Sequence, residues 1–294
     1  MTTSTNQQRE QLVNDAIREI SHIATLPEIT LKIVELVESP KSTAQDLNKV
    51  ISNDPALSAR ILKVVNSSFY GLPGQIGSIN RAIVMLGLNA VKNIAIAASL
   101  AKLFRGGDLT PSFSARTLWV HSVSTAATSK LVTDKCGLAF GDEAFLAGLI
   151  HDIGLMVEMQ YDRNKLIEVL QQTGADGKGV PSESMLDIEE KVFGANHQNF
   201  GAALCEKWKF PQSFRLVTGH HHRPLELPTE NRTLSCVIYI ADRLVGEVGR
   251  FRLDLTHLDI DPGVMDHLKL TSEKLADLRQ ALPEHLKTAD QLLS

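Results

Sequence analysis

The stretch from Phe145 to Met156, FLAGLIHDIGLM, is apolar except for His151 and Asp152 at its centre. A run of this kind is expected to lie in the core of the folded chain. Burying an imidazole and a carboxylate is costly unless the two groups are paired, hydrogen-bonded or bound to a metal. Consecutive side chains of a helix point about 100° apart, so both can still reach one ion at its edge. The stretch therefore predicts a buried polar site around His151 and Asp152.

Other polar residues stand in similarly apolar segments and are candidates to meet this pair. His121 lies within TLWVHSVSTAATSKLV, and Asp242 lies within LSCVIYIADRLVGEV. Further histidines come between them: His197, His220, His221 and His222. Imidazole together with carboxylate is the ligand set of zinc, iron, nickel or manganese sites. A metal site is therefore one explanation of these residues.

Each candidate also has a plainer explanation. A single histidine in an apolar helix, such as His121, is more often a hydrogen-bonded core residue than a ligand. The remaining alternatives are that backbone amides hold Asp152, that Asp242 pairs with Arg243 or Lys207, that His197 caps a helix, and that residues 220–222 form a solvated loop.

The composition limits the class of protein. A chain of 294 residues with 43% hydrophobic residues can build a full core, and its net charge of −4 gives no bulk attraction to nucleic acid. Its three cysteines have no paired spacing and are expected to be reduced thiols. We find no signal peptide and no apolar stretch of about 18 residues without a charge. These features predict a soluble cytoplasmic protein that does not enter a membrane.

The spacing of apolar residues predicts an all-α fold. Asp54 and Pro55, for example, are expected to begin a helix that buries apolar residues up to about position 67. Residues 10–105 are predicted to form a compact bundle of short helices, which ends at a break near 105–111. The candidate residues fall in later helices, expected at about 112–133, 141–159, 197–208 and 233–248. The tail, 251–294, is more polar.

Taken in order, these segments resemble the HD superfamily of metal-dependent phosphohydrolases. The wider context is similar to one branch of it, the HDOD domain (HD-related output domain). The resemblance rests on LPEITLKIVELV, ISNDPALSARILKVVNSSFYG, SINRAIVMLGLNAVKNIAI, FLAGLIHDIGLM, HQNFGAALCEKWKFP and HHRP. It implies a multi-helical HD-like bundle divided into an N-terminal segment (1–17), an HDOD domain (18–250) and a C-terminal helical tail (251–294). Within the domain, a helical bundle (18–107) would precede a metal-site subdomain (108–250).

The resemblance also implies a ligand set. The metal ligands would be His121, His151, Asp152, His197, His221, His222 and Asp242. His221 and His222 are preferred over His220 because HHRP fits the pattern of the branch. The site would hold one or two divalent ions of iron, manganese, nickel or zinc.

The sequence departs from the related HD-GYP phosphodiesterases at three points. Thr117 stands where those enzymes carry a glutamate, so that a bridging carboxylate is lost. Arg223 and Pro224 follow the histidines where a glutamate and a Gly-Tyr-Pro element are expected, which argues against hydrolysis of cyclic dinucleotides. The lysine that follows the His-Asp pair in some of those enzymes is also missing. The expected function is an HDOD-type signalling or regulatory module that retains an HD-type metal site and binds a partner protein, with a homo-oligomer as a further option. The alternative is a metal-dependent phosphohydrolase acting on a phosphomonoester, a phosphodiester or a nucleotide. Nucleic acid is not an expected partner, because ISNDPALSARILKVVNSS has few basic residues.

Overall fold

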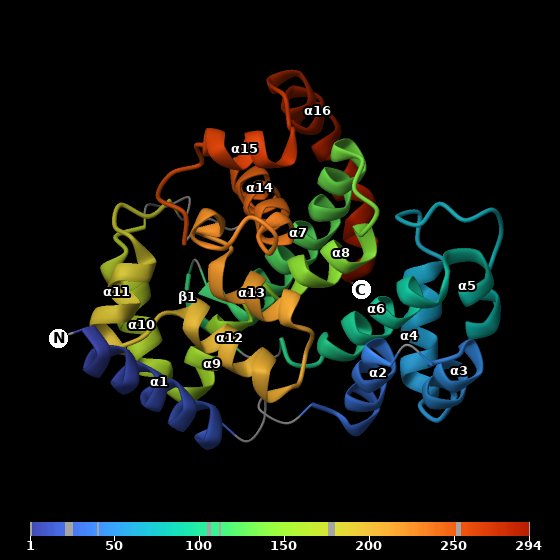
Figure 1. Cartoon of the computed structure of the whole chain (residues 1–294), viewed down its shortest axis with the longest axis horizontal. Coiled ribbons are helices and arrows are strands. Elements are labelled where there is room, and N and C mark those ends of the chain that lie inside the picture. Colours follow the sequence, from blue (N-terminus) through green and yellow to red (C-terminus); the bar gives the residue numbers. More distant parts are fainter. Residues whose placement is uncertain are drawn as a thin grey trace.

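The chain forms a helical structure with almost no sheet (Figure 1). The computed structural model describes residues 2–20, 26–39, 41–104, 107–111, 113–175, 180–250 and 254–293. Within these residues, sheet is limited to one small antiparallel hairpin, β1 (Asp108–Thr110) and β2 (Phe113–Ser114). The predicted all-α class is therefore confirmed. No helix in the described part of the chain has both the length and the apolar character needed to cross a membrane.

A bundle of short helices comes early in the chain. It consists of α2 (Glu28–Glu38), α3 (Ala44–Ser52), α4 (Pro55–Val65), α5 (Ile79–Leu86) and α6 (Leu88–Leu100). Helix α4 begins as predicted, because the Asp54 carboxylate accepts a hydrogen bond from the Leu57 amide and Pro55 occupies the first turn. Helix α6 packs against α2 and α4 on one side and against α8 on the other. It therefore joins the bundle to the rest of the molecule.

The first helix does not belong to this bundle. Helix α1 (Thr2–Glu19) packs against α9 and α12, which come much later in the sequence. Figure 1 shows α1 on the opposite side of the molecule from α3 and α5. The expectation that residues 10–105 form one bundle is therefore wrong for its first helix.

The second half of the molecule is built around two long helices. Its elements are α7 (Ala115–Cys136), α8 (Gly141–Ile150), α9 (Ile153–Tyr161), α10 (Arg163–Gln172), α11 (Met185–Val192), α12 (His197–Lys207), α13 (Gln212–His220), η1 (Pro224–Glu226) and α14 (Thr233–Glu247). Helices α7 and α14 pack against each other, and both contact α8. The C-terminal elements α15 (Pro262–Leu268), α16 (Ser272–Ala289) and η2 (Asp290–Leu293) follow, and α16 lies along α7.

Two of the predicted helix limits are corrected by the structure. The helix that carries His121 begins at Ala115 rather than near 112, because β2 precedes it and Ser114 caps it. The helix expected over 141–159 is broken, since α8 ends at Ile150 and α9 begins at Ile153. The backbone of Asp152 leaves the helical region there, with φ −98° and ψ 17°. His151 and Asp152 therefore lie in a turn between two helices and not on one continuous helix.

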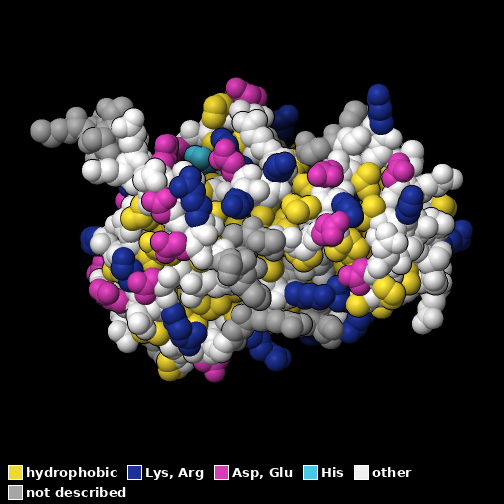
Figure 2. Space-filling view, turned by 90° about the horizontal axis from the view of Figure 1, so that it is seen from below, with side chains coloured by type: hydrophobic (Ala, Val, Ile, Leu, Met, Phe, Trp, Pro, Cys, Tyr) yellow, Lys and Arg dark blue, Asp and Glu magenta, His cyan; other side chains and the backbone are white. Residues whose placement is uncertain are grey.

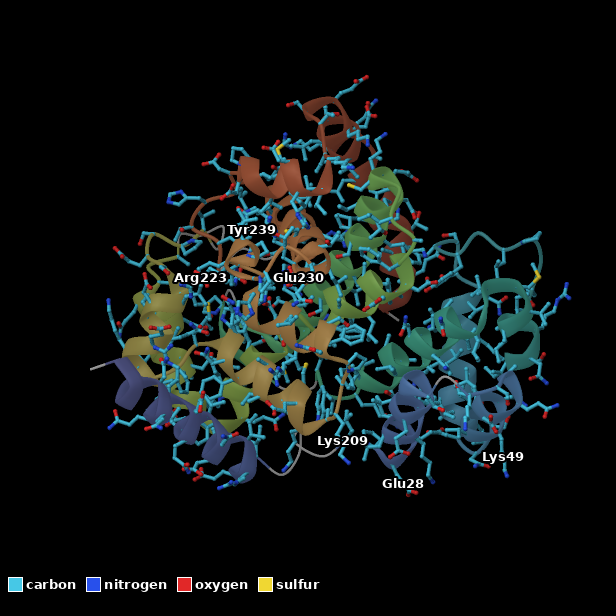
Figure 3. All side chains as sticks on the ribbon, viewed as in Figure 1. Glu28, Lys49, Lys209, Arg223, Glu230 and Tyr239 are labelled. Atoms are coloured by element: carbon cyan, nitrogen blue, oxygen red, sulfur yellow. The ribbon has the colours of Figure 1, made fainter. Side chains whose placement is uncertain are left out.

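Charged side chains of both signs are mixed with apolar ones on the face seen in Figure 2. Lys49, just before the segment ISNDPALSARILKVVNSS, is exposed at the outer edge of the bundle (Figure 3). Within that segment, the Arg60 side chain donates a hydrogen bond to the Ala98 carbonyl.

Candidate metal centre

All seven predicted site residues lie together in the second half of the molecule. His121 comes from α7, Asp242 from α14 and His197 from the first position of α12. The other four come from two turns: His151 and Asp152 between α8 and α9, and His221 and His222 directly after α13. All of them are fully buried except His222, which is 9% exposed. Their donor atoms form two groups, each with the spacing that a metal ion requires.

The inner group consists of His121, His151 and Asp242. The Nε2 atoms of the two histidines are 3.2 Å apart, and the His121 Nε2 lies 3.3 Å from the Asp242 Oδ1. Each histidine donates its Nδ1 proton to a backbone carbonyl, His121 to Arg250 (3.2 Å) and His151 to Gly148 (2.7 Å). This arrangement directs both Nε2 atoms into the cluster, where they can act as ligands.

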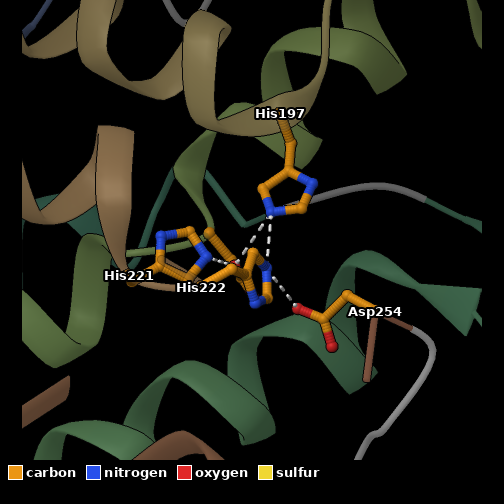
Figure 4. A group of neighbouring side chains, drawn as sticks. His197, His221, His222 and Asp254 are labelled. Atoms are coloured by element: carbon orange, nitrogen blue, oxygen red, sulfur yellow. Dashed lines mark hydrogen bonds and ion pairs between the residues drawn. The ribbon is translucent and has the colours of Figure 1, made fainter. Parts of the chain in front are cut away.

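The outer group consists of Asp152, His197, His221, His222 and Asp254. The Nε2 atoms of His197 and His222 are 3.1 Å apart, and the His222 Nε2 lies 3.5 Å from the Asp254 Oδ2 (Figure 4). The His221 Nε2 lies 3.2 Å from the Asp152 Oδ1. His222 and Asp254 are the only members with measurable exposure, so this group lies nearer to the surface than the inner one.

Asp152 stands between the two groups. Its Oδ1 faces the outer group, and its Oδ2 lies 3.2 Å from the His151 Nε2 and 3.4 Å from the His121 Nε2. A carboxylate that offers one oxygen to each side can bridge two ions. The two groups therefore form one continuous cluster of imidazoles and carboxylates.

The electrostatics of the cluster favour bound positive charge. Burial acts to lower the pKa of His121, but the neighbouring carboxylates of Asp152 and Asp242 outweigh it and raise that pKa well above its usual value. In the outer group, burial lowers the pKa of His221 to about 4, which keeps its imidazole neutral and able to coordinate. Burial, followed by the charges of Asp152 and Asp242, raises the pKa of Asp254 to about 7.

The residues present fit divalent metal ions. Both carboxylate oxygens of Asp152, Asp242 and Asp254 are buried without a hydrogen bond of acceptable geometry, and so is the His221 Nε2. Buried carboxylates without donors are costly, and a cation among them removes that cost. Five histidines with three aspartates suit iron, manganese, nickel or zinc.

The plainer explanations of Asp242, His197 and the histidine triplet do not match the observed contacts. Arg243 lies over the Tyr239 ring and donates to the Asp259 carbonyl, so its guanidinium is directed away from Asp242. Lys207 is exposed, whereas Asp242 is buried. The cap of α12 is Asn196 rather than His197. Within the histidine triplet, His220 bonds the carbonyl of its own helix at Leu216 and belongs to neither group.

Three acidic residues of the site were not predicted. Asp254 lies beyond residue 250, in a segment that was assigned to the polar tail. It stands between Leu253 and Leu255 in the sequence, so the criterion that identified Asp242 was also available for it. Glu189 accepts hydrogen bonds from the His197 backbone amide (3.0 Å) and from its Nδ1 (2.9 Å). Glu158 is fully buried, and burial with the neighbouring Glu189 raises its pKa well above the usual value.

Comparisons with known proteins agree with this architecture. The family model of the HDOD domain matches residues 23–224. An HDOD domain protein of unknown function from Geobacter sulfurreducens is 22% identical, with a TM-score of 0.69 over 95% of this chain and 98% of the other. A candidate phosphohydrolase from Shewanella amazonensis is 19% identical, with a TM-score of 0.73 over 96% and 98% of the two chains.

A candidate signal transduction protein from Marinobacter aquaeolei is 20% identical, with a TM-score of 0.74 over 97% of this chain and 64% of the other. An uncharacterized protein of Treponema pallidum is 24% identical over 242 residues, which are 81% of this chain and 45% of that protein. The chain therefore spans about half the length of this curated relative. The match of the family model covers most of the chain and confirms the resemblance seen in the sequence: the protein belongs to the HDOD domain family.

Proposed function

We propose that the chain is an HDOD signalling module that holds two divalent metal ions, one in the inner and one in the outer group. The observation that carries this proposal is the position of Asp152, which offers one carboxylate oxygen to each group. A bound divalent cation would neutralise the buried carboxylates and, beside a substrate, would polarise a phosphoryl oxygen. The residues of this chain would hold the ions, with the Nδ1 partners fixing the orientation of His121, His151 and His197.

The closure of the cluster supports a regulatory role over a catalytic one. The inner ligands are fully buried, and in the outer group the His222 side chain is 5% exposed while that of Asp254 is buried. The hydroxyl of Thr117, one turn before His121, is used to cap α7 with Ser114. Arg223, labelled in Figure 3, is half exposed and pairs with Glu226. Neither Thr117 nor Arg223 therefore supplies a carboxylate in place of the glutamate that HD-GYP enzymes carry at that position.

A partner protein and a cytoplasmic location are parts of the same proposal. Cys136, Cys205 and Cys236 are free thiols, as expected for a protein of a reducing compartment. The comparison with the signal transduction protein of Marinobacter aquaeolei supports the signalling role as an analogy of fold.

A metal-dependent phosphohydrolase is the second candidate. Two adjacent ligand groups that share a carboxylate are the arrangement that two-metal phosphatases and nucleases use. Solved structures of similar fold from Shewanella amazonensis are described as candidate phosphohydrolases, one of them metal-dependent.

Elemental analysis of the tag-free protein tests the metal centre. We expect about two ions per chain in the wild type after incubation with Mn²⁺ or Fe²⁺, and none in the His151→Ala/Asp152→Ala double variant. A wild-type protein that binds no metal under these conditions would refute the proposal.

Assays of the loaded protein then separate the two candidates. The regulatory proposal predicts no turnover of phosphomonoester, phosphodiester or nucleotide substrates while both ions are bound. Turnover that disappears in the double variant would replace the regulatory proposal with the phosphohydrolase.

A further inference from the structure

We propose that Asp254 is a ligand of the outer ion, so that the outer position depends on Asp254 whereas the inner position does not. The inference rests on the proposed metal centre and divides it into two positions with different ligand requirements. Both groups include one carboxylate beyond residue 224, where the family match ends: Asp242 in the inner group and Asp254 in the outer group.

The contacts of Asp254 indicate a ligand rather than a structural acid. Its two carboxylate oxygens are buried and have no hydrogen bond of acceptable geometry. Within the part of the chain that the structure describes, its ion-pair partner is His222, at 3.5 Å from Nε2 to Oδ2. His222 belongs to the outer group itself. The side chain is therefore directed into the cluster, and no lysine or arginine among the described residues forms an ion pair with it (Figure 4).

Nearby arginines are occupied elsewhere. The Arg243 guanidinium donates to the Asp259 and Tyr239 carbonyls. The Arg250 guanidinium donates to the Asp290 carboxylate at 2.9 Å from Nη2 to Oδ2. A buried carboxylate whose surroundings consist of other ligands needs a cation or a proton. In this cluster a bound cation would satisfy the Asp254 carboxylate together with the other buried polar atoms that lack a hydrogen-bond partner.

The balance of charge makes Asp254 decisive for the outer ion. The inner group has a carboxylate of its own, Asp242, and also faces the Asp152 Oδ2. Without Asp254, the outer group would retain three histidines and the Asp152 Oδ1, which is shared with the inner side. Helix α7 adds no carboxylate, because the residue one turn before His121 is Thr117 and its hydroxyl caps the helix. Asp254 therefore supplies the carboxylate that is particular to the outer position.

The test is the Mn²⁺ content of desalted protein after loading, for the wild type and for Asp254→Asn. We expect about two ions in the wild type and about one in the variant. Electron paramagnetic resonance provides a second readout. The wild type should show a spin-coupled pair, and Asp254→Asn should show the hyperfine pattern of an isolated Mn²⁺. Asp259→Asn is the matched control, because Asp259 is exposed on the same segment and offers its backbone carbonyl rather than its side chain. It should keep both ions.

Asp254→Ser is the second variant and is expected to lose the same ion, so that a folding defect of one substitution does not decide the result. Variants that keep both ions and the spin-coupled signal would overturn the inference and leave the proposed metal centre intact. Variants that stay folded by circular dichroism but lose both ions would also overturn it, because the inner position would then need Asp254. A wild type without metal would instead refute the proposed function itself.

Discussion

His197 owes its orientation to Glu189, a carboxylate that belongs to neither ligand group. One oxygen of Glu189 accepts hydrogen bonds from both the backbone amide and the Nδ1 of His197. Burial alone would lower the pKa of His197, but Glu189 raises it to about 9. A carboxylate in this position fixes the tautomer and the ring orientation of a ligating histidine.

Glu189→Gln is therefore expected to weaken the outer ion. The substitution keeps an acceptor of similar shape but removes the charge, and we expect the affinity for the second Mn²⁺ to fall about 10–100-fold. Titration calorimetry of metal-free protein measures this. Glu183→Gln, the same change at an exposed residue of the preceding loop, should match the wild type. Equal affinities in wild type and Glu189→Gln would show that Glu189 does not position His197.

Gly154 determines how closely α9 approaches the first turn of α12. A Cβ atom added there would lie 1.8 Å from the His197 carbonyl oxygen and 2.9 Å from the Gly201 amide nitrogen. Both are backbone atoms, so the two helices would have to separate. Gly154→Ala should lower the free energy of unfolding by about 1–3 kcal/mol or more in urea titrations. Gly77→Ala, where the added Cβ meets nothing within 4 Å, should change it by less than about 0.5 kcal/mol. Similar stabilities of the two variants would contradict this account.

The residues of the site were predictable to different degrees. A polar residue inside an apolar helix stands out in a sequence, and this singled out His121, His151, Asp152 and Asp242. Asp254 stands between two leucines but outside any expected helix, so the search for polar residues within apolar helices does not single it out. Glu189 was missed for another reason. It lies on an amphipathic helix with other acidic residues, and only the packing of α11 against the start of α12 shows which of them is buried.

At the scale of elements, the turn between α8 and α9 determines the geometry of the centre. The His151 imidazole donates to the Gly148 carbonyl in the last turn of α8, and the Asp152 backbone then leaves the helix. This break is not evident from the sequence, because the stretch contains no proline and both sides of it are apolar. A periodicity of apolar residues identifies helical segments, but it does not report a turn that side-chain hydrogen bonds create.

The close approach of α7 and α8 sets the distance between His121 and His151. A Cβ atom at Gly148 would lie 2.8 Å from the Ala126 Cα and 2.9 Å from its amide nitrogen. Gly148→Ala should therefore separate the helices, lower the free energy of unfolding by about 1–3 kcal/mol and reduce the Mn²⁺ content. Gly141→Ala, on the same helix, meets only the side chains of Thr133 and Lys130, which can shift. We expect normal metal content in this control, and an equal loss in both variants would be evidence against the mechanism.

At the scale of the whole molecule, the C-terminal elements connect both halves to the centre. The backbone carbonyl of Arg250 accepts the Nδ1 proton of His121, and the guanidinium of Arg250 binds Asp290 in η2. The neighbouring Gln291 side chain accepts a hydrogen bond from the Ser68 amide of the early bundle, at 2.9 Å. The sequence predicted helices in the tail but not this position, because the contacts join residues far apart in the chain.

Removing the Asp290 carboxylate should therefore weaken metal binding at the inner group. The pair is partly exposed, so Asp290→Ala should cost about 0.5–1 kcal/mol of stability in urea titrations. The variant should also have a lower affinity for the first Mn²⁺, because the Arg250 backbone carbonyl orients His121. Glu284→Ala removes an acid of the neighbouring helix α16, one that pairs with Lys287 on the exposed surface, and should leave metal binding unchanged. Identical metal affinities of the two variants would argue against a connection from the C-terminal elements to the centre.

The order in which the ligands occur along the chain has a consequence for biosynthesis. A ribosome makes His121 early, but the inner group lacks its own carboxylate until Asp242 has been made, and Asp254 comes later still. A nascent chain that stops before Asp242 holds the histidines with Asp152 as the one carboxylate of the cluster. The inner ion would therefore enter after Asp242 has been made and the outer ion after Asp254, and each ion would reflect the supply in the cell at that moment as much as the preference of the ligands.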